Sequence, residues 1–105
     1  MEEKILCAAI WFKDLPSLVD DIPSSLLRPI NCDRGIVFCG HRHPHCLYQM
    51  VALTGKSSYE VGESSQGFLT NLNRFVDRKE GGRIHIANGG VLSYSDKTLY
   101  SEDLY

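Results

Sequence analysis

The segment GFLTNLNRFVDRKE, residues 67–80, constrains the fold more than any other part of this chain. Residues 67–70 and 74–76 have the composition of two short strands, and the Asn-containing link between them is typical of a hairpin turn. Asp77 precedes Glu80 by three positions, so the Asp77 side chain is placed to accept a hydrogen bond from the amide of residue 80 at a helix N-terminus. The segment therefore predicts a hairpin that leads directly into a helix.

Two more strands and another helix are expected elsewhere. Residues 4–12 and 36–39 are short continuous apolar runs, which is typical of buried strands. Over residues 43–54 apolar side chains recur at helical spacing, with Pro44 suited to the first turn and Gly55 suited to the end.

The second helix is expected over residues 78–88. It contains Gly81 and Gly82, which should soften it because each glycine costs roughly 1 kcal/mol relative to alanine in a helix. Residues 13–35 are rich in proline and form the least regular part of the chain. Together these elements predict one α+β domain, residues 1–105, with a small, mostly antiparallel sheet and two main helices.

Length and charge limit the classes of function. The net charge of −2 argues against a protein that binds duplex nucleic acid, because such proteins usually carry a strong basic surplus. The N-terminus is acidic and the first apolar run is short. We therefore expect this run to be neither a signal peptide nor a membrane span. We expect a cytoplasmic protein whose four cysteines are reduced thiols.

The densest group of reactive side chains is the block CGHRHPHC, residues 39–46. A glycine that leaves a strand just before a helix begins favours an anion-binding corner, because free amides and the helix dipole both attract negative charge. Arg42 is placed to bind a phosphate with two hydrogen bonds, and His41 or His43 can donate as well. The alternative is an ordinary polar loop between a strand and a helix.

Two other chemistries compete for the same block. Zinc usually binds two separated ligand pairs, whereas this chain has one crowded cluster that would need Cys7 or Cys32 to join it. A thiol nucleophile with a histidine partner is also possible, but neighbours in sequence rarely have the required geometry. We expect no metal, no cofactor and no catalytic residues.

Aromatic and cationic residues alternate in the hairpin and helix. Phe68 and Phe75 lie among Arg74, Arg78 and Lys79, and such a mixture suits a stacked base with its phosphates. The alternative is that both phenylalanines are core residues, since apolar strand residues usually face a core, and that the cations form a solvated helix face. Trp11, at the end of a strand, is either core or the wall of a pocket.

Three strings of this sequence resemble small proteins encoded by phages and prophages. They are GFLT (67–70), RFVDRKE (74–80) and the closing LYSEDLY (99–105), which match a G-F-x-T…R-F-V-[DN]-R-x-E core and an S-E-D-L-[YW] end. The resemblance extends to residues 8–12 and 39–46, so that it covers about half the chain, and it leaves out residues 13–35. On these strings the chain is identified as a member of the first Thoeris anti-defence family, the viral sponge proteins.

The resemblance implies a non-catalytic homo-oligomer in the bacterial host cytoplasm, with no membrane or duplex nucleic-acid partner. Such proteins bind and hide cyclic ADP-ribose isomers, the immune signals of bacterial TIR-domain proteins. Carried over by position, the ligand-binding residues would be Trp11, Arg42, Phe68 and Asp77, although the family pattern also admits Asn at residue 77. In this interpretation Arg42 takes pyrophosphate and Phe68 with Trp11 sandwiches adenine. The full set of expected ligand-binding residues is Trp11, His41, Arg42, His43, Phe68, Arg74, Phe75, Asp77 and Arg78.

Two alternatives stay open at this point. One is a phosphodiesterase or glycohydrolase that uses His41, His43 and His45. The other is a protein-binding inhibitor or zinc-containing interaction module that uses the Tyr-rich tail, residues 99–105. A tail this rich in Tyr and Leu is expected either to pack on its own domain or to lie at an interface with a second copy.

Overall fold

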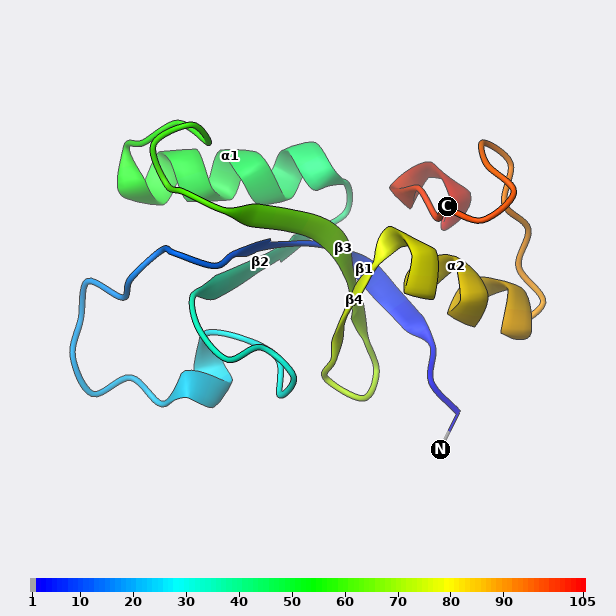
Figure 1. Cartoon of the computed structure of the whole chain (residues 1–105), viewed down its shortest axis with the longest axis horizontal. Coiled ribbons are helices and arrows are strands. Elements are labelled where there is room, and N and C mark those ends of the chain that lie inside the picture. Colours follow the sequence, from blue (N-terminus) through cyan, green and yellow to red (C-terminus); the bar gives the residue numbers. More distant parts are fainter. Residues whose placement is uncertain (1) are drawn as a thin grey trace.

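Four strands form one antiparallel sheet in the order β2-β1-β3-β4 (Figure 1). The strands are β1 (Ile5–Phe12), β2 (Ile36–Gly40), β3 (Ser64–Thr70) and β4 (Phe75–Asp77). The structure is a computed structural model that describes residues 2–105. With its two helices, the sheet confirms the α+β class. No helix in the described part of the chain is long and apolar enough to cross a membrane.

The hairpin between β3 and β4 forms where the sequence predicts it. The amide of Thr70 donates to the carbonyl of Arg74, and Asn73 takes a left-handed conformation with φ 58° inside the turn. Gly67 is required for close pairing, because a Cβ at this position would lie 2.1 Å from the carbonyl oxygen of Val76.

Both helices pack on one face of the sheet, the face that carries Ala8, Ile10 and Phe12. They are α1 (His43–Thr54) and α2 (Arg78–Ala87). Met50 of α1 and Ile84 of α2 belong to the same buried cluster as those strand residues. This cluster is the main core.

The pair Gly81–Gly82 brings α2 close to its neighbours. Both glycines are buried. A Cβ on Gly81 would lie 3.0 Å from the ring of Phe68, and a Cβ on Gly82 would lie 2.6 Å from the carbonyl oxygen of Lys97. The glycines therefore permit close packing, a role that their helix propensity alone does not indicate.

The irregular segment 13–35, which contains the short helix η1 (Ser24–Leu26), covers part of the other face of the sheet. Cys32 from this segment packs with Ala9 and Phe75. Asn31 also follows the edge of β4: its side chain donates to the carbonyl of Phe75 at 2.7 Å and accepts from the Phe75 amide at 2.8 Å. The Asn31 side chain thus forms hydrogen bonds with the backbone of Phe75, on an edge of β4 that pairs with no other strand of the described chain.

The C-terminal segment folds back onto its own domain and contains the short helix η2 (Ser101–Asp103). Leu99 is fully buried, and its amide donates to the carbonyl of Arg78. Of the two expectations for this tail, packing on its own domain is confirmed.

Candidate functional site

A pocket of about 390 Å³ opens where α1 and α2 begin. Figure 1 shows the N-terminal end of α1, the start of α2 and η2 meeting in the middle of the molecule. Gln66 of β3 also lines the pocket. We call this site the helix-start pocket; its lining residues are His43, Pro44, Leu47, Tyr48, Gln66, Arg78, Ser101 and Glu102.

Arg78 is the main cation of the helix-start pocket, and it is half-buried. Its guanidinium donates to the carbonyl of Leu99 at 3.3 Å and to Gln66 Oε1 at 2.5 Å. The guanidinium also lies 4.8 Å from the ring centroid of Tyr100. These partners are all neutral, so the positive charge of Arg78 is not compensated.

Three of the other five arginines of the described chain have carboxylate partners, whereas Arg28 and Arg42 bond to backbone oxygens. Arg34, Arg74 and Arg83 each form ion pairs within 4.0 Å, whereas Arg78 does not. Three contacts occupy Arg78, and a guanidinium has five N–H donors, so two N–H groups have no partner among the described residues.

His43 contacts Arg78 through its imidazole ring. It is buried, its Nε2 lies 2.8 Å from the carbonyl oxygen of Gly67, and its Nδ1 lies 3.4 Å from Arg78 Nη2. The arrangement requires a neutral ring that donates from Nε2 and accepts at Nδ1. Burial lowers the pKa of His43, and the charge of Arg78 lowers it further, although the hydrogen bond to Gly67 acts in the opposite direction.

Two further side chains give the pocket an aromatic wall and a negative charge. Tyr48 on α1 is 68% exposed, next to the half-buried Leu47. Glu102 of η2 is exposed and forms no ion pair with Arg78 within the part of the chain described. The pocket therefore offers a cation, an acceptor and a flat apolar surface.

Arg42 does not reach the helix-start pocket. Its guanidinium donates to the backbone oxygens of Ser101 and Tyr105 and lies 5.2 Å from the Tyr105 ring centroid. His41 stacks on the same ring, with centroids 4.6 Å apart and planes 6° apart. The structure thus places both residues, expected at a phosphate, against the tail.

The three histidines of the block 39–46 face different partners. His41 lies on Tyr105, His43 points to Gly67, and His45 Nδ1 accepts from the Arg42 amide at 3.0 Å. Among residues 2–105, no three His, Cys, Asp or Glu side chains are grouped so that they could hold a metal ion. The crowding in sequence does not produce one convergent site.

Arg74 and Asp77 make contacts that stabilise the fold. Arg74 forms two hydrogen bonds of 2.8 Å with the carboxylate of Glu3. Asp77 is the N-cap of α2 and accepts from the Glu80 amide at 2.7 Å, as the sequence predicts. The cap is worth roughly 1 kcal/mol.

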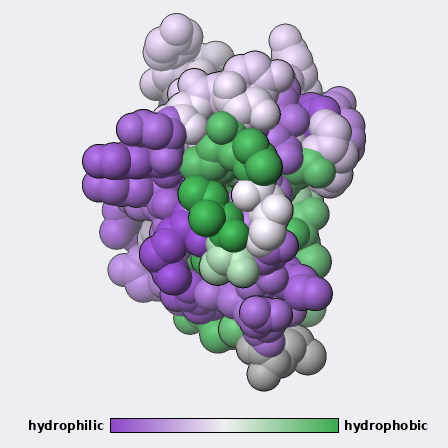
Figure 2. Space-filling view, turned by 90° about the vertical axis from the view of Figure 1, so that its right-hand side faces the viewer, coloured by the Kyte–Doolittle hydropathy of each residue, from purple (hydrophilic) through white to green (hydrophobic). Residues whose placement is uncertain are grey.

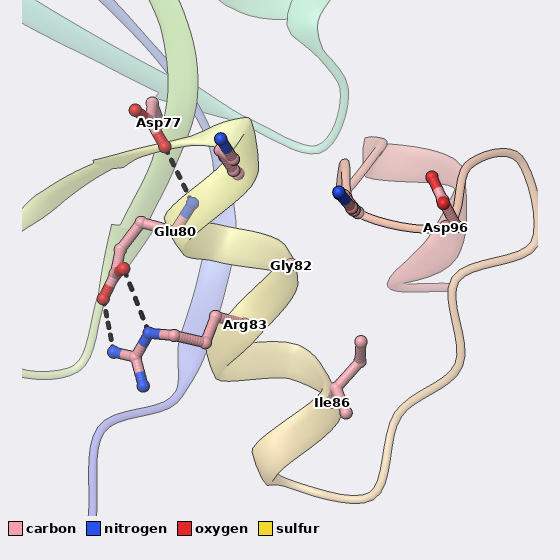
Figure 3. Close-up of a pocket in the computed structure, with 8 residues that line it drawn as sticks. Asp77, Glu80, Gly82, Arg83, Ile86 and Asp96 are labelled. Atoms are coloured by element: carbon pink, nitrogen blue, oxygen red, sulfur yellow. Dashed lines mark hydrogen bonds and ion pairs between the residues drawn. The ribbon is translucent and has the colours of Figure 1, made fainter.

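Asp77 also borders a second cavity of about 470 Å³ along α2, the α2 groove. Figure 3 shows Glu80 between Asp77 and Arg83, with its carboxylate on the Arg83 guanidinium. Three cationic and three acidic side chains line this groove, so their formal charges cancel. The lining residues are Asp77, Lys79, Glu80, Gly82, Arg83, Ile86, Asp96 and Lys97.

The expected adenine sandwich between Phe68 and Trp11 is wrong for this fold. Phe68 pairs with Ala8 and shares the face covered by the helices, where it is 0% exposed. Trp11 lies on the other face, because side chains alternate along β1, and its ring meets Phe75 edge-on at 5.8 Å. Phe75 is also buried. No base can contact both Trp11 and Phe68 across the sheet.

The structure therefore brings together two of the expected ligand-binding residues, His43 and Arg78, and adds three that the sequence did not single out. These are Tyr48, Gln66 and Glu102. Tyr48 could have been suspected, since it places a large aromatic side chain outside the apolar stripe of its helix. Nothing in the sequence near Gln66 or Glu102 indicates a pocket.

A comparison with protein families places this chain among phage proteins. The family model described as Phage T4 y16D protein matches residues 4–105, so the chain belongs to that family. No curated protein and no solved structure matches the chain significantly.

Proposed function

We propose that this phage protein is an anti-defence protein that binds a cyclic ADP-ribose-type immune signal in the host cytoplasm and hides it without cleaving it. The helix-start pocket is the proposed binding site. Membership of a phage protein family and the resemblance to viral sponge proteins support the biological setting.

The observation that carries the proposal is the uncompensated charge of Arg78. A half-buried guanidinium with neutral partners attracts an anion strongly, because its positive charge is only partly solvated. The first turns of α1 and α2 border the same pocket and add partial positive charge. A pyrophosphate would satisfy all three features together.

The size and the aromatic wall of the pocket suit the rest of a nucleotide. Its volume, about 390 Å³, falls within the range of roughly 300–1,000 Å³ that small-molecule sites occupy. The exposed ring of Tyr48 provides a face on which a base can stack, an interaction worth about 1–3 kcal/mol. Tyr48 thus takes the place that the sequence assigned to Phe68.

Binding without cleavage is supported by the state of His43. Both of its ring nitrogens already have partners, so neither is available to move a proton on a bound nucleotide. Glu102 is the other titratable carboxyl or imidazole group lining the pocket. A single exposed carboxylate does not supply both the nucleophile and the general base that covalent catalysis needs.

Calorimetric titration with a cyclic ADP-ribose isomer made by a Thoeris TIR enzyme tests the proposal. Tight binding, with the unchanged isomer recovered by chromatography after heat release, is the expected result. Arg78→Ala should weaken binding at least tenfold. Arg83→Ala should leave binding unchanged. It removes a guanidinium of the same charge from the same helix, but one that is exposed and forms an ion pair with Glu80.

Two results would contradict the proposal in different ways. Absence of binding would remove the sponge assignment altogether. Recovery of an opened or hydrolysed ligand would replace sequestration with catalysis.

We also propose that the protein forms homo-oligomers. Figure 2 shows apolar side chains gathered on the end of the molecule formed by α2 and the segment after it. Ile86 and Val91 of this region are 52% and 71% exposed, a pattern typical of surfaces that other copies cover. Light scattering during gel filtration should give a mass of at least two chains, and Ile86→Asp should lower it.

A further inference from the structure

The helix-start pocket contains a carboxylate as well as a guanidinium. Glu102 comes from η2, whereas Arg78 comes from the first turn of α2. Arg78 uses Leu99, Gln66 and His43 as its partners, and not Glu102. The pocket therefore offers two opposite charges that form no direct ion pair with each other.

Glu102 keeps most of its acceptor capacity. Its one hydrogen bond within the described residues is a long contact of 3.5 Å from the hydroxyl of Ser101. A carboxylate has two oxygens and about four lone-pair positions, so it can accept two hydroxyl protons side by side. The 2′ and 3′ hydroxyls of a ribose present such a pair of donors.

A carboxylate also disfavours certain ligands. A phosphate placed next to Glu102 would meet a like charge in a partly enclosed pocket, where water screens the repulsion less well than in bulk solution. Acidic side chains in dinucleotide-binding folds act in this way: they accept the ribose 2′ hydroxyl, and an arginine is needed where a 2′-phosphate is to be accommodated.

We infer that Glu102 sets the ribose specificity of the helix-start pocket: it accepts unmodified ribose hydroxyls of a nucleotide whose phosphates lie on Arg78, and it excludes nucleotides that carry a 2′-phosphate. The inference rests on the proposed function, since it assumes a nucleotide in this pocket. It adds the chemical class of ligand that the pocket accepts and the residue that makes the choice.

The test compares two probes, cyclic ADP-ribose and cyclic ADP-ribose 2′-phosphate, by calorimetry on the full chain. The unmodified protein should bind the first at least tenfold more tightly than the second. Glu102→Gln should reduce this ratio at least fivefold, chiefly by tighter binding of the 2′-phosphate. Glu102→Asp keeps the charge and should retain most of the discrimination.

Asp96→Asn is the matched control, because it removes one exposed negative charge from the α2 groove instead. It should leave the ratio unchanged. An equal fall of the ratio in this control would show a general charge effect and overturn the role of Glu102.

The remaining outcomes separate this inference from the proposed function. If the unmodified protein binds both probes equally and Arg78→Ala weakens both, the inference fails while the proposed site stands. If neither probe nor the TIR-made isomer binds, both fail. If the TIR-made isomer binds through Arg78 and neither probe does, the pocket requires that isomer's linkage, and the inference about Glu102 is overturned.

Discussion

Replacement of Gly82 by alanine should destabilise the protein, even though alanine is the better helix former. Helix propensity alone predicts a gain of roughly 1 kcal/mol for this change. Gly82 is buried against the segment that leads into the tail, and a Cβ would lie 2.6 Å from the carbonyl oxygen of Lys97. Ordinary contact begins at about 3.4 Å, so one of the two backbones must move.

The size of the effect follows from what holds that segment in place. Lys97 and Thr98 donate their amides to the hydroxyl of Ser95, and Leu99 is fully buried with its amide on the carbonyl of Arg78. Overpacking against such a fixed backbone costs about 1–3 kcal/mol. Set against the propensity gain, Gly82→Ala should lower the free energy of unfolding by about 1 kcal/mol.

Urea denaturation followed by circular dichroism measures this change, and the m-value should stay constant. Gly81→Ala is the matched control, since the atoms nearest to its Cβ would be side-chain atoms of Phe68 and Leu99, at 3.0 and 3.3 Å, rather than backbone atoms. It should be the more stable of the two variants. A stabilisation of about 1 kcal/mol in both would refute the argument from close backbone approach, because propensity would then account for everything.

Three other measurements follow from the same structure. Phe68→Ala should cost about 3–5 kcal/mol of stability because the ring is fully buried. Tyr48→Ala should leave the urea midpoint nearly unchanged and weaken ligand binding. The reverse pattern would show that Phe68, and not Tyr48, contacts the ligand. A hydrogen bond from Cys39, with a second from the Gly40 amide, lowers the pKa of Cys7 to about 7, whereas burial raises the pKa of Cys46 to about 11. Iodoacetamide near pH 7.5 should therefore modify Cys7 first, and mass spectrometry measures the order of labelling. Faster labelling of Cys46 would contradict this. Burial lowers the pKa of His43 from its ordinary value of 6.5, so near this pH the unfolded chain binds a proton that the folded chain does not. The urea midpoint should therefore fall as the pH drops below about 6.5. A midpoint that rises over this range would show that His43 is charged in the fold.

The local elements were predictable because their signals are local. The run that forms β1, the apolar spacing over His43–Thr54 and the Asp77 cap each depend on residues within a few positions of one another. The hairpin was predictable for the same reason. Each of these predictions is confirmed to within a few residues.

The composition of the site was not predictable in the same way. Whether Trp11 and Phe68 share a face depends on the register of β1 against β3, which pairs Ala8 with Phe68 and is set by contacts far apart in sequence. Arg42 was expected at a phosphate, but the folded-back tail supplies it with backbone oxygens. Tyr48 and Glu102 become neighbours of Arg78 only when α1, α2 and η2 meet.

The hydrogen bonds of Asn31 have a consequence for how copies of the protein can associate. Sheets that continue from one chain into another need a row of unpaired amides and carbonyls along an edge strand. At Phe75 both groups are already bonded to the Asn31 side chain, in the geometry that an incoming strand would use. Copies that assemble would therefore have to join through side-chain surfaces rather than by strand addition at this edge. Asn31→Ala would open the position to the self-association by strand pairing that leads to aggregation.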